Sequence, residues 1–241
     1  MLKTSIIRQP LVKQTDRSAM YELHSRYFCN IHKDIFLRDM SEKDWIIVLA
    51  DEENHIRGFS TIKIMHTHFN DQQQLFLFSG DTIVHRDFWR TGALAGGFGH
   101  MILRLNREHP DIPAYWFLIS KGYRTYRFLP VFFKEFYPVH HTATPPYYQS
   151  LLNQIGQFKF KDHYDPASGV IKFFGSKDHL SPEMCEIPAG RERDAHVQFF
   201  LQKNPGYIYG DELACIAAIS PNNLNKAGHR TIDNTAVTWH E

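Results

Sequence analysis

The sequence predicts an α/β fold in which helices flank a mixed, largely antiparallel sheet. Three strand-like segments follow one another with short polar turns between them, which indicates hairpin-linked antiparallel strands. The third strand leads into an amphipathic helix, and another apolar strand follows that helix. Consecutive hairpins followed by a helical crossover favour a mixed sheet over a doubly wound one.

The elements before the crossover can be assigned in order. Apolar residues recur at helical spacing from Ser18 to Phe28, and Trp45–Leu49 has the continuous apolar character of a buried strand. A polar turn at Asp51–Asn54 separates that strand from an alternating one over Ile56–Met65. The run Asn70–Gln74 supplies the next turn. These segments predict a helix and the first two strands of a hairpin-linked sheet.

The third strand covers Leu75 to Val84 and contains a glycine. Its bulky apolar residues flank Ser79, Gly80 and Asp81. An isolated glycine within a strand pattern indicates a β-bulge or the close approach of another group. We therefore expect Asp81 to be a carboxylate at a distorted point of the strand.

A helix is predicted from about Thr91 to Glu108, ahead of the stop signal at Pro110. It contains Gly96, Gly97 and Gly99, each of which costs roughly 1 kcal/mol relative to alanine in a helix interior. Either a neighbouring element packs closely there or a ligand lies against the first turns. The start of a helix attracts anions through its unpaired N–H groups and its dipole, so a phosphate-bearing ligand is expected.

This order of elements resembles the core of the GNAT superfamily, the GCN5-related N-acyltransferases. The likeness covers about Ser18 to Pro138 and includes a second strand, Ala114–Ser120, and an aromatic helix, about Arg124–Phe136. In that family, amides of a turn reading Arg/Gln-x-x-Gly-x-Gly/Ala bind the pyrophosphate of coenzyme A. Aligned on Gly92, this chain has tryptophan at the Arg/Gln position and leucine at the small-residue position, so only the glycine matches.

The resemblance implies a set of residues that bind an acyl-CoA donor. The family's pyrophosphate-binding turn aligns with residues 89–94 of this chain, and Arg86 and Arg90 add positive charge there. The strand that follows the helix diverges from its neighbour in the family and leaves a wedge for the pantetheine arm, which places Ser120 beside the donor. The expected donor-binding residues are Arg86, Arg90, Thr91, Gly92, Ala93, Leu94 and Ser120.

Acyl transfer to an amine also needs a base and an acid. Asp81 is the expected base, provided that partial burial raises its pKa; the alternative is that it caps the bulge through nearby amides. His85 is the alternative base because its intrinsic pKa suits the task. Family members often carry a tyrosine that protonates the leaving thiolate, and Tyr126 is the expected equivalent, although the aligned position falls near Phe133 and a tyrosine in so aromatic a segment is more often a packing residue.

Composition narrows the class of protein. A net charge of +1 over 241 residues, without long basic runs, disfavours nucleic-acid binding. No apolar stretch reaches the roughly 20 residues that span a bilayer. Three widely spaced cysteines and no signal sequence at the start favour the cytoplasm. The histidines, including His66 with His68 and His140 with His141, lack a third ligand at metal-binding spacing, so no metal is expected.

The remainder of the chain is expected to complete and extend the domain. A short helix is predicted to begin over Tyr147 to Ile155, and the segments 157–164 and 169–175 alternate like a strand pair around a proline-glycine turn. Helices are predicted at Arg191–Gln202 and Gly210–Ile219. We thus divide the chain into a GNAT-like domain, 1–176, and a C-terminal helical extension, 177–241, packed on the same domain as a lid, a pocket wall or a dimer contact.

Taken with the resemblance, the sequence favours an acyltransferase that moves an acetyl or longer acyl group from coenzyme A to a small-molecule amine or a peptide. Acyl-homoserine-lactone synthases share the scaffold and use carrier-protein donors, so an acyl carrier protein is left open as donor, and so is a homodimer. The alternative is a non-catalytic GNAT-like module that binds an acyl-CoA or a nucleotide.

Overall fold

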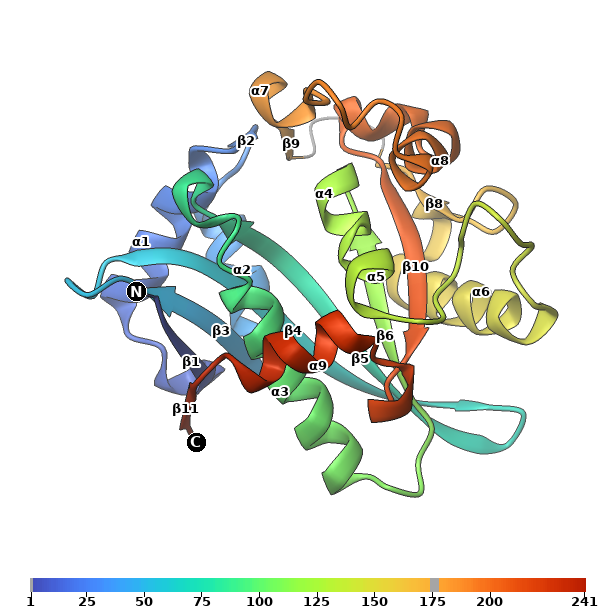
Figure 1. The fold of residues 1–241 in the computed structure, drawn as a ribbon, viewed down its shortest axis with the longest axis horizontal. Helices are drawn as coiled ribbons and strands as arrows, with labels where there is room; N and C mark the ends of the chain where they lie inside the picture. Colours follow the sequence, from blue (N-terminus) through green and yellow to red (C-terminus); the bar gives the residue numbers. More distant parts are fainter. Residues whose placement is uncertain (1, 174–177) are drawn as a thin grey trace.

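The computed structural model describes residues 2–173 and 178–241. In these residues nine strands form one sheet in the order β11-β1-β3-β4-β5-β6-β10-β8-β7, with helices on both faces (Figure 1). The strands of this sheet are β1 (Lys3–Arg8), β3 (Trp45–Ala50), β4 (Ile56–Phe69), β5 (Gln72–Val84), β6 (Ala114–Ser120), β7 (Tyr164–Asp165), β8 (Val170–Ile171), β10 (Glu212–Ala218) and β11 (Val237–His240). Two further strands, β2 (Phe28–Cys29) and β9 (His179–Leu180), pair with each other.

The helices among the described residues lie between the first and the last of these strands along the chain. They are α1 (Gln14–Ser25), α2 (Lys33–Ser41), α3 (Ala93–Glu108), α4 (Tyr123–Tyr126), α5 (Phe128–Phe132), α6 (Pro146–Phe160), α7 (Pro182–Cys185), α8 (Ala195–Lys203) and α9 (Lys226–Asp233). A single 3-10 turn, η2 (Arg86–Phe88), links β5 to the segment before α3. Among the described residues, none of these helices is long and apolar enough to cross a membrane.

The predicted fold class is confirmed. Strands β3, β4 and β5 pair antiparallel, and β5 pairs parallel with β6 from Leu75 opposite Ala114 to Ser79 opposite Leu118. The sheet is therefore mixed and largely antiparallel. Beyond Ser79, β5 continues against β4 as far as Val84, whereas β6 pairs with β10 on its other side. The two parallel strands run together and then part.

Alternate residues of the strands supply two opposite cores. On β3, Ile47 and Leu49 join the cluster that packs under α3, while Ile46 and Val48 join the cluster that packs under α1 and α2. This alternation follows from the two-residue period of a strand. Helix α6 covers the same face as α1 and α2, further along the sheet, through residues such as Leu152.

The bulge predicted at Gly80 is present. Ser60 pairs with Thr82 and Ile62 pairs with Ser79, so Thr61 alone stands opposite both Gly80 and Asp81. The extra residue reverses the alternation of β5, because Leu77 faces the α3 core whereas Ile83, six residues later, faces the α1 and α2 core. The bulge thus turns Asp81 towards the face covered by α1 and α2.

Close packing accounts for the glycines of α3. A Cβ on Gly96 would lie 2.0 Å from Oγ1 of Thr235, and one on Gly99 would lie 2.3 Å from Cγ1 of Ile232. Helix α9 crosses α3 at these glycines (Figure 1). A Cβ on Gly97 would lie 2.9 Å from Ile47 of β3. Of the two explanations open from the sequence, packing against neighbouring elements is confirmed, and a ligand on these three glycines is not.

Two predicted elements are wrong in type. Gly210–Ile219 was expected to be a helix, but Glu212–Ala218 forms β10, which lies inside the sheet between β6 and β8. A short apolar run buried on both faces has no period that separates strand from helix, and its alanines favoured the helical interpretation. The strand expected over 157–164 is also wrong, because α6 continues to Phe160 before η3 (Lys161–His163), and only Tyr164 and Asp165 form a strand.

Other predictions hold in part. The helix expected over Arg124–Phe136 is divided into α4 and α5, because Pro130 has no N–H to continue the helical ladder. Of the strand expected over 169–175, Val170 and Ile171 pair with β7, while residues 174 and 175 lie outside the described residues. The domain division at 176/177 also falls there and stays a prediction; β10 and β11 give the segment after it a share in the same sheet.

The contact between α3 and α9 can be tested by a double-mutant cycle. Gly99→Ala should destabilise the protein by about 1–3 kcal/mol, because its methyl group would overlap the Ile232 side chain. In an Ile232→Ala background only the Cβ, 3.7 Å away, remains, so Gly99→Ala should be neutral or stabilising there. Chemical unfolding of the four proteins measures both effects, and an equal cost in the two backgrounds would contradict the packing account.

Candidate active site

A cavity of about 430 Å³ opens where β5 and β6 part. Residues from α1, α2, β5, β6, α4 and α6 line it, together with Asp178 and with Glu212 of β10. Its walls combine aromatic side chains with seven carboxylate and lysine groups among the described residues. The charged lining residues are Asp39, Lys43, Asp81, Lys121, Lys159, Asp178 and Glu212. The concave shape, apolar walls and few converging polar groups are typical of a small-molecule site.

Asp81 lies on the cavity wall directly after the bulge glycine, and its side chain is 25% exposed. Burial, followed by the negative charge of Asp39, raises the pKa of Asp81 to about 7, while Lys43 opposes the shift. A carboxyl group titrating near neutral pH can hold a proton and give it up at little cost. Asp81 therefore has the desolvated setting that a general base requires.

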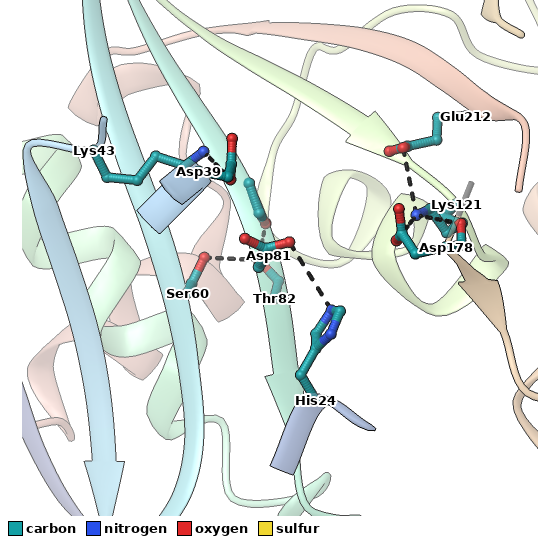
Figure 2. Close-up of polar contacts among 10 residues, drawn as sticks. His24, Asp39, Lys43, Ser60, Asp81, Thr82, Lys121, Asp178 and Glu212 are labelled. Atoms are coloured by element: carbon teal, nitrogen blue, oxygen red, sulfur yellow. Dashed lines mark hydrogen bonds and ion pairs between the residues drawn. The ribbon is translucent and has the colours of Figure 1, made fainter. Parts of the chain in front are cut away.

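His24 of α1 points towards Asp81 in Figure 2. Its Nε2 lies 3.9 Å from Oδ1 of Asp81, and its ring stacks on Phe28 at 4.1 Å between centroids. Burial lowers the pKa of His24 to about 4, so the imidazole is neutral near pH 7. Its Nδ1 has no hydrogen-bond partner among the described residues. The contact with Asp81 is thus polar, without a charge on the histidine.

Lys121, directly after β6, forms a second charged group across the cavity (Figure 2). Its Nζ donates to the Asp178 carbonyl at 3.0 Å, contacts the Asp178 carboxylate, and lies 3.6 Å from Oε1 of Glu212. Burial disfavours the charged form of this lysine, but Glu212 and Asp178 outweigh burial and raise its pKa. Lys121 stays protonated and is held between two carboxylates.

Lys43 packs against the bulge at Gly80. Its ammonium pairs with Asp39 one turn earlier along the chain, and its side chain is buried. A Cβ on residue 80 would lie 3.2 Å from Cε of Lys43 and 2.7 Å from Oγ1 of Thr61. Glycine at this position therefore leaves space for the lysine beside the strand. Thr82 closes the bulge by donating to the Gly80 carbonyl at 2.8 Å and by bonding Ser60 at 2.7 Å.

The other predicted catalytic residues lie outside this cavity. Tyr126 is fully buried, donates to the Pro138 carbonyl at 3.0 Å and packs among aromatic rings, which is the packing role left open from the sequence. Burial raises its pKa further. His85 caps η2 by accepting from the Asp87 amide at 3.4 Å and does not line the cavity. Only Asp81 of the three predicted catalytic residues faces the cavity.

The turn before α3 has an arrangement suited to an anion. Gly92 caps the helix with φ of 69°, a left-handed conformation that glycine adopts without strain. Among the described residues, the amides of Gly92, Leu94 and Ala95 donate to no other protein group, whereas the Ala93 amide donates to Thr91 Oγ1 at 3.4 Å. The side chains of Ala93 and Leu94 are buried, whereas Arg90 and Thr91 are exposed.

The remaining predicted donor-binding residues, Arg86 and Ser120, do not line the cavity. Arg86 pairs with Glu183, and its amide donates to the hydroxyl of Tyr27 at 3.0 Å. Ser120 is fully buried at the end of β6, and its hydroxyl has no hydrogen-bond partner among the described residues. No residue from 85 to 94 lines the cavity, so the structure brings Asp81 to the cavity but keeps the turn apart from it.

Sequence reasoning missed most of the polar residues of the cavity. His24, Lys43, Lys121 and Asp178 come from four separate segments, and none belongs to a motif with a recognisable spacing. The one available signal was Lys121, a charged residue at the end of an apolar strand beside the predicted wedge. No group of three or more His, Cys, Asp or Glu in the described part of the chain is placed to hold a metal ion.

The raised pKa of Asp81 should appear in the pH dependence of stability. The folded state binds the carboxyl proton of Asp81 more tightly than the unfolded state does. The stability that this proton adds is fully present below pH 4 and is lost as the pH rises to about 7. The free energy of unfolding of Asp81→Asn, relative to that of the wild type, should therefore increase between pH 4 and 7, by at most about 1.4 kcal/mol per pH unit. Urea unfolding at a series of pH values measures this difference.

The comparison of variant and wild type is necessary because His24 acts in the opposite direction. Its lowered pKa adds stability as the pH rises from 4 to 6.5, so the two slopes offset each other in the wild-type profile. Asp71→Asn, at an exposed hairpin position between β4 and β5, is the matched control and should show a constant difference. A constant difference for Asp81→Asn as well would mean that its pKa is ordinary.

The comparisons with known proteins found similarity only among solved structures. No protein-family model matches the chain, and no curated protein matches its sequence. An Enterococcus faecalis protein described as a probable N-acyltransferase is 11% identical with a TM-score of 0.41; the match covers 52% of this chain and about a third, 31%, of that one.

Two Escherichia coli structures have comparably low sequence identity and TM-scores. A GNAT family N-acetyltransferase in complex with CoA is 15% identical over 53% of this chain and 68% of that chain, with a TM-score of 0.39. The ribosomal-protein-S18-alanine N-acetyltransferase is 14% identical over 58% and 84%, also with a TM-score of 0.39. The hairpin-linked strands β3, β4 and β5, the bulge in β5 and the parting of β5 from β6 are those expected from the sequence, and these features give the chain a GNAT-like fold.

Proposed function

We propose that this protein is an acyltransferase that moves an acyl group from a coenzyme A thioester to an amine bound in the cavity between β5 and β6. One observation carries the proposal: Asp81 faces that cavity, and its pKa is raised to about 7 by burial and by Asp39. A carboxylate with an ordinary pKa would be a weak base for this task.

The proposed reaction requires one bond to form and one to break. The acceptor ammonium loses one proton to Asp81, and its nitrogen then attacks the thioester carbonyl carbon. The C–N bond forms, the C–S bond breaks, and the thiolate takes up the second proton, which the nitrogen loses as the amide forms. Lys121 and its carboxylate partners stand across the cavity from Asp81 and would hold a cationic acceptor nearby. We assign no proton donor to Tyr126, since its hydroxyl already donates to Pro138.

The donor is proposed to bind by its phosphates at the start of α3. The free amides of Gly92, Leu94 and Ala95 and the positive end of the helix dipole suit a diphosphate, and the exposed Arg90 adds charge. The packing of α9 against α3 comes close to this turn, with Thr231 3.5 Å from a Cβ built on Gly92. The acyl length, a carrier-protein donor, a peptide acceptor, a homodimer and a cytoplasmic location stay predictions.

A second candidate function is a non-catalytic module that binds an acyl-CoA or a nucleotide. The observation that favours it is the separation of the turn from the cavity, since no residue from 85 to 94 lines the cavity. Binding of an acyl-CoA without acceptor-dependent release of thiol would support this second candidate over the enzyme.

The catalytic role of Asp81 predicts a defined pH profile. With acetyl-CoA or octanoyl-CoA as donor and pooled amines as acceptors, the rate of thiol release should rise with pH and level off above about 7, as Asp81 loses its proton. Asp81→Asn should reduce the plateau rate by about 100-fold or more, because the base is gone. Asp71→Asn is the control and should match the wild type. An Asp81→Asn variant with the wild-type rate and profile would refute this role.

The role of the turn can be tested by donor binding alone. Arg90→Gln should weaken the binding of coenzyme A by roughly 3- to 30-fold, because a charge-assisted contact to phosphate is removed. Arg107→Gln changes an arginine at the opposite end of the same helix and should leave affinity unchanged. Calorimetry measures both. Equal affinity for all three proteins would place the phosphates elsewhere.

A further inference from the structure

The cavity that we propose for the acceptor separates its charges into two regions. At the parting of β5 and β6, Asp81 stands opposite Lys121, which two carboxylates hold (Figure 2). In this region Asp81 is the carboxylate to which the proposed function assigns the acceptor amine. The other region lies beneath α6, and a lysine supplies its charge.

Lys159 of α6 is that lysine. Its Nζ lies 4.2 Å from the ring centroid of Phe78, on the wall of the cavity. No ion pair or hydrogen bond joins its ammonium to another of the described residues. Asp39, a carboxylate that acts on it through space, is already paired with Lys43. Lys159 is therefore a cation that faces the cavity without a bound counter-charge from the described chain.

A second cation stands over the same ring. Nζ of Lys43 lies 5.8 Å from the Phe78 centroid, so two ammonium groups contact one aromatic ring. Burial, followed by repulsion from Lys43, lowers the pKa of Lys159. Asp39 is paired with Lys43, and Glu42 acts on Lys159 only through space, so neither carboxylate forms an ion pair with the Lys159 ammonium. A bound anion would supply that ion pair.

We infer that the acceptor is an amine that also carries a carboxylate, with its amino group beside Asp81 and its carboxylate at Lys159. This inference deepens the proposed function by naming the acceptor class. Phe36, Phe160 and Ile119 on the cavity walls suit an apolar side chain, and the volume of about 430 Å³ suits a molecule the size of an amino acid. The structure thus points to an apolar or aromatic amino acid.

Paired ligands test this inference without an acyl donor. Calorimetry on the full chain would compare L-leucine, L-methionine, L-phenylalanine and L-tyrosine with the carboxamide of each, which keeps the amine and removes the negative charge. At least one free acid should bind about tenfold or more tightly than its carboxamide, since a charge-assisted contact is lost in the amide. Lys159→Met keeps the aliphatic stem and should abolish that preference.

Two further variants separate charge from folding. Lys159→Arg keeps the positive charge and should retain most of the preference for the acid. Lys33→Met changes an exposed lysine of α2 that does not line the cavity and should behave as the wild type. The inference is overturned if no acid is preferred over its carboxamide, or if Lys159→Met retains the preference.

The outcome is distinguishable from that of the proposed function, because binding is measured before any transfer. An acid-selective cavity in a protein that releases no thiol would sustain the inference about the ligand and reject the enzyme. Thiol release with simple amines, without a preference for ligands that carry a carboxylate, would support the enzyme and reject the inference about the ligand.

Discussion

The bulge at Gly80 is the constraint on which the rest of the site depends. Two residues of β5 stand opposite one of β4, and this reverses which face of the sheet each later residue meets. Without it, Asp81 would point into the apolar core beneath α3, where a carboxylate could not be accommodated. Glycine is required because Thr61 and Lys43 occupy the space that a side chain would fill. The Thr82 hydroxyl donates to the Gly80 carbonyl in the bulge and bonds the Ser60 hydroxyl on β4.

The charges around the cavity follow from its position at the end of paired strands. Where β5 and β6 part, their side chains lose a neighbouring strand, and residues from α1, α2, α6 and the segment before β9 fill the margin. Each buried charge there except Lys159 has an opposite charge or a histidine close by. Asp81 is shifted because burial and Asp39 act together on it, whereas Lys121 is kept charged because two carboxylates outweigh its burial.

The two sides of the sheet are specialised differently. On one side α9 packs into the glycine face of α3, so this face is filled by the chain itself. On the other side, α1, α2 and α6 do not close over the parting strands, and the cavity remains. The turn at Gly92 belongs to the first side and Asp81 to the second, which explains why the expected donor-binding turn and the expected base share no cavity in this structure.

Local patterns in the sequence determined the hairpin-linked strands, the crossover helix, the bulge glycine and Asp81 as a carboxylate at a distorted strand position. Each depends on residues a few positions apart, where period and backbone preference act directly. The type of β10 was decided only by the tertiary structure, because burial on both faces erases the alternation that marks a strand. The same is true of His24, Lys43, Lys121 and Lys159, whose meeting around one cavity depends on contacts between segments that are distant in the chain. The shifted pKa of Asp81 likewise exists only after folding, since burial and the charge of Asp39 cause it.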